Sequence, residues 1–218
     1  MADDYHGFIE NTDVLHSPGY HSWQDGVTYN EISPDTIQQL SETFMNAFGE
    51  YGIEVFDENG IFNASMSLGG DGVLTYDPNL LWSVGENFGA DAISGVLAHE
   101  VGHHMVEQVF GDHALEITSW QHELCADYIA GIVTQLGGMS PEAMHKFYSD
   151  FNISPINDME HPAGGLRSEA FDAGIEWAEN NHNAIFSEFL LKDKSVLMDM
   201  FETDVLNHFP GSLEEYLG

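Results

Sequence analysis

The 218-residue sequence predicts an α+β domain with a small antiparallel or mixed sheet and a helix-rich C-terminal part. Three observations predict it. The chain is 43% hydrophobic and rich in aromatic residues, so it is long enough and apolar enough to bury a core. Residues 53–67 and 70–78 read as short strands separated by glycine-containing turns. After residue 90, apolar side chains recur three and four positions apart, which is typical of helices.

The elements are predicted in order along the chain. Residues 1–30 show no strand or helix period, so we expect an irregular N-terminal arm. Ser33 is the predicted N-cap of the first helix, with Pro34 at its first position. The face of this helix that points to the core is predicted to hold Ile37, Leu40, Phe44 and Phe48.

Helices fill most of the remaining chain. Long helices are predicted over about 91–110 and 115–136, and a Ser-Pro start at Ser140 begins a third. The chain after HPAGG (residues 161–165) is predicted to be mostly helical. No repeat, low-complexity tract or linker interrupts the pattern, so residues 1–218 are predicted to form a single domain.

The charge is strongly acidic, with 37 Asp and Glu residues against four Lys and Arg residues and a net charge of −33. Such a surface repels nucleic acid and anionic membranes. Adaptation to high salt is one explanation of this composition, and a solvated acidic surface without special meaning is the other. A single cysteine, Cys125, excludes an internal disulfide framework.

Residues 96–105, VLAHEVGHHM, place three histidines and a glutamate in an apolar stretch of predicted helix. Residues four apart share one helical face, so His99 and His103 can bind one metal ion together. Glu100 is rotated by about 100° from His99, so it flanks the metal position and can take a proton from a metal-activated water. This HExxH arrangement is typical of metallopeptidases with a glutamate as general base. Two core histidines with ordinary hydrogen-bond partners are the alternative.

A third ligand is predicted in WQHELCADYIAGIV, residues 120–133, where Glu123 and Asp127 share one face among apolar neighbours. Two buried carboxylates at this spacing repel each other and are costly to bury, and a bound divalent cation would offset both effects. Glu123 is the predicted metal ligand, and Asp127 is predicted to orient a ligating histidine through its second ring nitrogen. A solvated acidic face is the alternative.

Other candidate ligands are predicted to lie at the surface. The extended HExxHxxGxxH pattern is excluded because Val106 and Val109 stand where it needs glycine and histidine. The nearby polar residues that we expect at the surface are Asp112, His113, Glu116 and His122.

These motifs resemble the gluzincin metallopeptidases, the class that includes thermolysin, and most closely a bacterial family of neutral zinc metallopeptidases with HExxH and ELxAD motifs. The matching residues are YDP at 76–78, HEVGHH at 99–104, ELCADYIAG at 123–131 and HP…R at 161–167. The resemblance covers roughly residues 50–175. This chain departs from the family at Cys125, where a polar residue is usual, and in its acidic surface.

The resemblance implies a zincin-like fold and a zinc-dependent metalloendopeptidase that holds one Zn²⁺ per chain and acts on a peptide or protein. It also implies that the GVLTYDP strand (residues 72–78) is an edge strand along which the substrate pairs. His161 is then a candidate donor to the oxyanion. Arg167 is the other candidate, and a buried salt bridge is the alternative role for this arginine.

Two other functions remain open at this point: a noncatalytic zincin-fold binding or assembly module, and a zinc hydrolase of a non-peptide amide. No signal peptide, membrane anchor or membrane span is visible, so the expected location is cytoplasmic. The pattern predicts no nucleic-acid partner and makes no prediction of oligomeric state.

Overall fold

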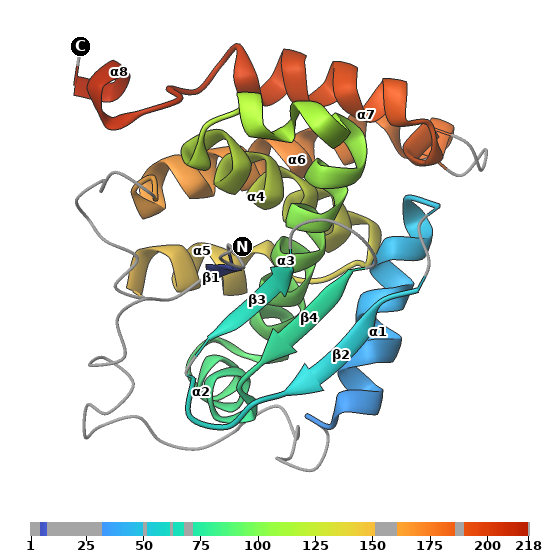
Figure 1. Cartoon of the computed structure of the whole chain (residues 1–218), viewed down its shortest axis with the longest axis vertical. Coiled ribbons are helices and arrows are strands. Elements are labelled where there is room, and N and C mark those ends of the chain that lie inside the picture. The colour runs from blue at the N-terminus through green and yellow to red at the C-terminus, as the bar shows by residue number, and fades with distance from the viewer. Residues whose placement is uncertain are drawn as a thin grey trace.

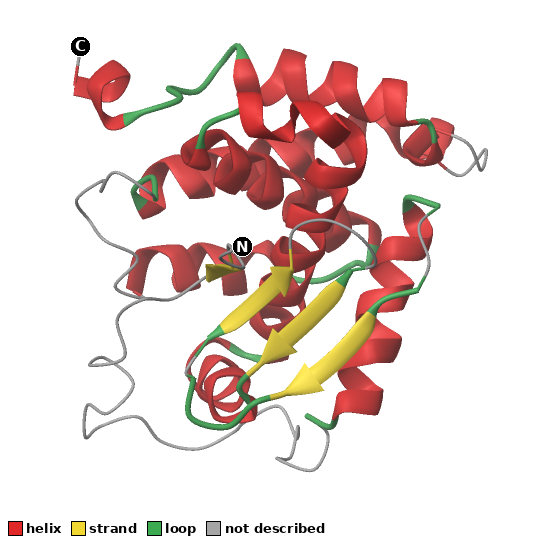
Figure 2. Ribbon diagram, viewed as in Figure 1, coloured by secondary structure: helices red, strands yellow, loops and turns green. Residues whose placement is uncertain are grey.

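A computed structural model of the chain describes residues 5–7, 32–49, 52–61, 63–67, 72–150, 161–185 and 190–217. The described part is α+β: one small sheet lies against a larger group of helices (Figure 1). The strands form a single layer, and the described chain beyond the last of them consists of helices joined by loops (Figure 2). The predicted fold class, a small mixed sheet followed by a helix-rich C-terminal part, is confirmed.

The strands are β1 (Tyr5–Gly7), β2 (Glu54–Asp57), β3 (Ala64–Ser67) and β4 (Val73–Tyr76). The α-helices are α1 (Pro34–Ala47), α2 (Pro78–Phe88), α3 (Ala90–Phe110), α4 (Ser119–Leu136), α5 (Pro141–Asp150), α6 (Gly164–Ile185), α7 (Lys194–Met200) and α8 (Leu213–Leu217). Shorter helical turns are η3 (Gly111–Glu116), η4 (Leu190–Lys192) and η5 (Phe201–Leu206). Of the predicted N-terminal arm (residues 1–30), residues 1–4 and 8–30 lie outside the described residues, and β1 belongs to the arm.

The sheet has the strand order β1-β3-β4-β2. β4 pairs with β3 in antiparallel and with β2 in parallel orientation, so it is an interior strand. The prediction that residues 72–78 form an edge strand is therefore wrong. The resemblance implied an edge position, but β2 lies on the far side of β4, and β3 carries the edge on which β1 lies.

Capping chemistry explains where several helices begin. The Ser33 side chain accepts a hydrogen bond from the Thr36 amide at the start of α1, as predicted. The Asp77 side chain caps α2 in the same way, although this helix was not predicted. α4 begins at Ser119, after the cap residue Thr118, so the predicted start near residue 115 was too early. The intervening residues form the short turn η3 instead.

α3 runs through the middle of the molecule and is in contact with both the sheet and α4 (Figure 1). Two glycines let its neighbours approach closely. A Cβ atom at Gly95 would lie 2.3 Å from the Met144 sulfur on α5, and one at Gly102 would lie 2.7 Å from the Ala126 carbonyl oxygen on α4. Both distances are too short for a side chain, so only glycine allows this close packing.

A second pair of glycines sets the crossing of α4 and α6. A Cβ atom at Gly131 would lie 2.0 Å from the Phe171 carbonyl oxygen, and one at Gly174 would lie 2.0 Å from the Tyr128 carbonyl oxygen. Each glycine thus faces the other helix's backbone. The crossing brings the N-terminal part of α6, which carries Arg167, against the acidic residues of α4. Within the described part of the chain, no helix combines the length and apolar character needed to span a bilayer.

Candidate metal centre

His99 and His103 on α3 and Glu123 on α4 converge on one point, and their candidate ligand atoms all lie within 4.8 Å of one another. This buried group could hold a metal ion. His99 Nε2 is 3.6 Å from Glu123 Oε2, and His103 Nε2 is 3.4 Å from Glu123 Oε1. Two ligands bound tetrahedrally at 2.0–2.1 Å from a zinc ion lie about 3.3 Å apart. The spacing therefore fits a small tetrahedral cation with only slight adjustment.

Asp127, one turn after Glu123 on α4, orients His99. The His99 Nδ1 atom lies 2.8 Å from Asp127 Oδ1. A proton on Nδ1 donates to this carboxylate and leaves Nε2 with its lone pair toward Glu123. The Tyr148 hydroxyl donates to the same oxygen at 2.8 Å. The contact predicted between Asp127 and a ligating histidine is thus present.

Arg167, the chain's only arginine, is the cation of this group. Its guanidinium donates to both Asp127 oxygens, at 2.7 Å and 2.9 Å, and one of its nitrogens is 3.0 Å from Glu123 Oε2. The side chain is 1% exposed, and Tyr148 stacks against it with 5.7 Å from the guanidinium carbon to the ring centre. Of the two roles considered for Arg167, the geometry is that of the buried salt bridge.

The charges of the group explain its protonation. Burial alone would raise the pKa of the Glu123 and Asp127 carboxyls, but Arg167 and the neighbouring histidines outweigh it, so the pKa of both carboxyls is lowered. Burial lowers the pKa of His99 to about 4, against the opposing charge of Asp127. His99 is therefore neutral near pH 7, the form that binds metals.

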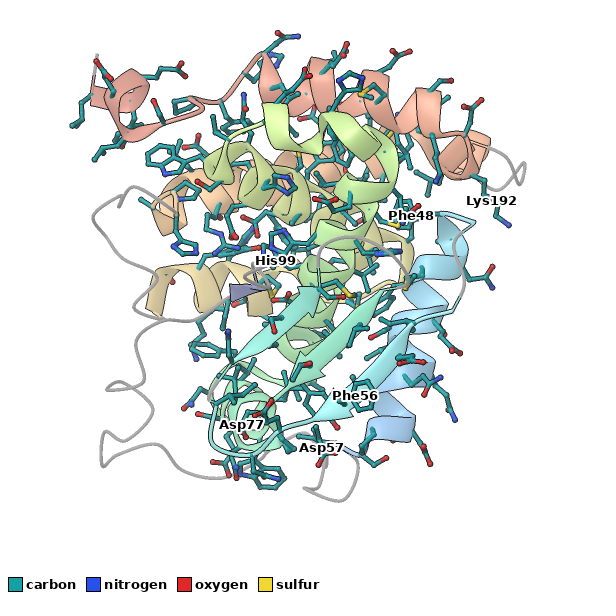
Figure 3. The ribbon with its side chains drawn as sticks, in the orientation of Figure 1. Phe48, Phe56, Asp57, Asp77, His99 and Lys192 are labelled. Atoms are coloured by element: carbon teal, nitrogen blue, oxygen red, sulfur yellow. The ribbon has the colours of Figure 1, made fainter. Side chains whose placement is uncertain are left out.

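Glu100 is fully buried beside this group. It follows His99, which is labelled in Figure 3, in the chain. Neither carboxylate oxygen has a hydrogen-bond partner among the described residues. Burial, followed by the charge of Glu123, raises the pKa of Glu100 well above its usual range. The backbone of Met66 on β3 acts weakly in the opposite direction, although this contact does not have hydrogen-bond geometry. A buried carboxyl without a fixed partner is free to exchange a proton with a ligand.

Two more histidines lie close to the group. His122 is 5% exposed, so the prediction that it lies at the surface is wrong. Its ring centre is 6.4 Å from that of His103, and its Nε2 atom is 3.9 Å from Glu107 Oε1. His122 lies one turn before Ala126, which packs against Gly102 of α3, so the close approach of the two helices buries it. His104, on the other side of α3, is 4% exposed and faces Gly72.

The remaining predicted residues differ in their placement. His113 and Glu116 have exposed side chains and pair with each other, as expected for surface residues. His161 is half-buried just before α6, and its role as an oxyanion donor stays a prediction.

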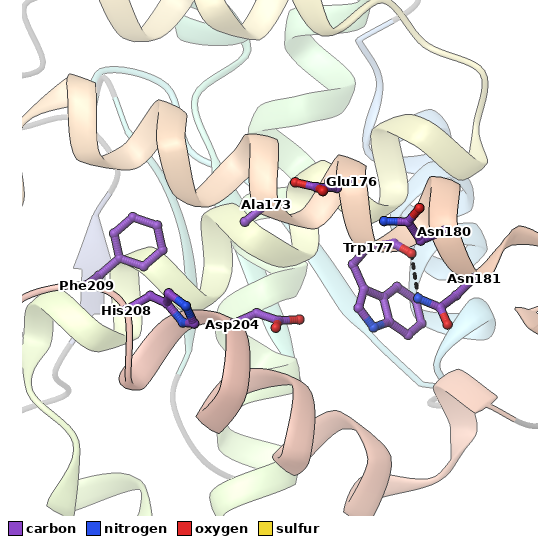
Figure 4. A pocket seen from close by; sticks show the side chains of 8 residues that line it. All are labelled: Ala173, Glu176, Trp177, Asn180, Asn181, Asp204, His208 and Phe209. Atoms are coloured by element: carbon purple, nitrogen blue, oxygen red, sulfur yellow. Dashed lines mark hydrogen bonds between the residues drawn. The ribbon is translucent and has the colours of Figure 1, made fainter.

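A cavity of about 370 Å³ lies between α6 and the turn η5 (Figure 4). None of the candidate metal ligands lines it. The Asp204 carboxylate at its edge accepts a hydrogen bond from the Tyr128 hydroxyl at 2.7 Å, so this acid has a structural partner. The cavity is lined by Ala173, Glu176, Trp177, Asn180, Asn181, Asp204, His208 and Phe209.

No protein-family model, curated protein or solved structure matches this chain. The site is therefore interpreted from its own geometry. The observations that bear on function are a buried group of two histidines and a glutamate that could hold a metal ion, a buried carboxyl beside it, and an aspartate and an arginine in contact with it.

Proposed function

We propose that the chain is a zinc-dependent metallopeptidase of the gluzincin type. The observation that carries the proposal is the position of Glu100, a buried carboxyl without a hydrogen-bond partner among the described residues, beside the His99, His103 and Glu123 group. A centre that serves structure alone does not need an acid there. A metal bound to the three ligands would supply a Lewis acid that acidifies a water molecule and polarises the scissile carbonyl.

The chain's own residues would then divide the work as follows. Glu100 takes the proton of the attacking water on a carboxylate oxygen and returns it to the nitrogen of the leaving amine. Its pKa is raised while the site holds no cation, and a nearby positive charge would bring the pKa down toward the range that suits a general base. Asp127 holds the His99 ring through Nδ1, and Arg167 holds Asp127.

A metal centre that serves only structure or assembly is the second candidate, and one observation favours it. His99, Glu100 and Glu123 are at most 1% exposed, which is typical of closed structural sites. Hydrolysis of a non-peptide amide would use the same residues on a smaller substrate. A Glu100 variant separates catalysis from a structural role, because only catalysis needs Glu100, and the choice of substrate separates the two hydrolases.

The first experiment is metal analysis. The purified protein should hold about one zinc ion per chain, because three candidate ligands converge on one point. His99→Ala and Glu123→Ala should lose the metal, whereas His145→Ala, at a half-exposed histidine paired with Asp172, should keep it. Mass spectrometry of the metal content decides. A protein that takes up no zinc, and gains no thermal stability from added zinc, would refute the proposal.

The second experiment separates an enzyme from a binding module. Glu100→Gln should keep the metal and the fold but cleave a labelled unfolded protein about 10²- to 10⁴-fold more slowly, the worth of general-base catalysis. Glu107→Gln is the matched control, since it makes the same change two turns further along α3, outside the ligand set. Equal rates for Glu100→Gln and the wild type would exclude the mechanism. A zinc-loaded wild type that cleaves no protein or peptide, but does hydrolyse small amides, would favour the non-peptide alternative.

A further inference from the structure

The edge of β3 that faces away from β4 is the edge on which β1 lies, and α3, which carries Glu100, packs against β3. The Asp77 amide donates to the Asn63 carbonyl oxygen at 2.8 Å, so the main-chain groups of residue 63 point toward β4. Main-chain groups alternate between the two edges of a strand, so those of Met66 point to the opposite edge. Met66 is also the residue of β3 whose backbone lies near the Glu100 carboxyl. A peptide paired with this edge would therefore run past the proposed general base.

β1 lies on that edge. It pairs with β3 in antiparallel orientation, with Tyr5 opposite Ser67, His6 opposite Met66 and Gly7 opposite Ser65. An extended peptide that adds to a sheet edge makes the same main-chain hydrogen bonds as a strand of the sheet. The chain's own N-terminal strand thus occupies the position where an extended substrate would pair, and its central residue faces Met66.

We propose that β1 is a built-in competitor of the substrate, which closes the β3 edge until a peptide displaces it. The pairing of β1 with the β3 edge does not depend on the proposed peptidase function. Its effect on substrate binding rests on that function. The burial of the ligand group agrees with it. Because His99, Glu100 and Glu123 are at most 1% exposed, a peptide reaches them only after some segment of the chain moves.

β1 is suited to a reversible role. It is three residues long, so few main-chain hydrogen bonds hold it in place. It is nevertheless tethered, and a tethered segment competes at an effective concentration on the order of millimolar. The apparent affinity for a substrate is reduced by the fraction of molecules with an open edge. A peptide that binds the open edge tightly, through side-chain contacts as well as main-chain hydrogen bonds, displaces β1. A peptide that binds the open edge weakly does not.

The test compares full-length chains that differ at residue 6. In His6→Pro the proline removes the main-chain N–H that faces Met66, which weakens β1, whereas His6→Ala keeps the N–H and is the matched control. The probe is a fluorescent synthetic peptide with the sequence of residues 1–12, and its binding is measured by anisotropy. All proteins carry Glu100→Gln, so that the probe stays intact.

We expect the peptide to bind the His6→Pro protein at least about tenfold more tightly than the proteins with His6 or with His6→Ala. The reason is that the β3 edge is open in a larger fraction of the His6→Pro molecules. Amide exchange at Met66 should be faster in His6→Pro alone. Equal affinities in all three proteins, or no binding to any, would overturn the inference.

Cleavage by the same residue-6 variants with Glu100 intact separates this inference from the proposed function. His6→Pro should cleave a labelled unfolded protein faster than the wild type and His6→Ala at low substrate concentration. If the wild type cleaves and His6→Pro is no faster, β1 is not a competitor. If no variant cleaves while His6→Pro still binds the peptide more tightly, the peptidase proposal fails and the occupied edge stands.

Discussion

Replacing Arg167 by methionine tests the electrostatic balance of the site. The guanidinium makes two hydrogen bonds to Asp127, at 2.7 Å and 2.9 Å, and approaches Glu123 to 3.0 Å. Methionine fills part of the space but leaves two carboxyl groups buried without their cation. Removing one partner of a buried ion pair costs about 3–5 kcal/mol. We expect the free energy of unfolding of Arg167→Met to fall by about that amount in metal-free protein.

The loss should depend on pH in a defined direction. Arg167 lowers the pKa of Glu123 and Asp127 in the folded state relative to the unfolded chain. A lowered carboxyl pKa stabilises the fold above the ordinary carboxyl pKa near 4, and this contribution is lost as the pH falls through the folded-state value. The difference between the wild type and Arg167→Met should therefore be largest near pH 7 and shrink at acid pH.

Zinc should restore part of the stability of Arg167→Met, because a cation bound to Glu123 replaces the missing charge. The assay is urea unfolding, with and without zinc, at several pH values. Lys146→Met is the control, since it removes an exposed cation and should change the stability by less than about 0.5 kcal/mol. The reasoning is refuted if metal-free Arg167→Met is as stable as the wild type near pH 7, or if zinc stabilises both proteins equally.

Three further predictions concern stability. Gly174→Ala places a Cβ atom 2.0 Å from the Tyr128 carbonyl oxygen and should destabilise the protein by about 1–3 kcal/mol in denaturant unfolding, while Gly165→Ala, with open space around it, should not. Burial raises the pKa of Glu100, so the metal-free wild type should lose stability relative to Glu100→Gln as the pH rises from about 4.5. If the free energies of unfolding of the two proteins change with pH in the same way, this prediction is contradicted. The melting temperature should rise from low to molar NaCl, since salt screens the repulsion behind the net charge of −33, and a constant value would remove salt adaptation from consideration.

Local patterns predicted local structure well. The Ser33-Pro34 start of α1 and the extent of α3 follow from capping chemistry and apolar spacing, which act within a few residues. α2 was missed because Asp77 and Pro78 were assigned to the end of a strand, although an Asp-Pro pair before apolar residues is also a helix start. The start of α4 could have been placed by the Thr118 and Gln121 capping box.

Relations between distant elements were less accessible. The ligand group was predicted because its three members lie in two motifs whose helical spacing fixes most of the geometry. The order of the strands is not fixed by any local spacing, so the interior position of β4 was missed. The burial of His122 depends on how closely α3 and α4 approach, which is set by Gly102 and not by the neighbours of His122 in sequence.

The same helix contacts determine both the stability of the domain and the geometry of the candidate metal centre. Gly102 sets the approach of α4 to α3, and Gly131 and Gly174 set the approach of α6 to α4. These approaches fix the distances from Glu123 to the α3 histidines and to the α6 arginine. A change that widens either crossing would move a ligand or the counter-charge by the same amount. Loss of metal affinity should therefore accompany loss of stability in the glycine variants, even though none of the three glycines is a candidate ligand.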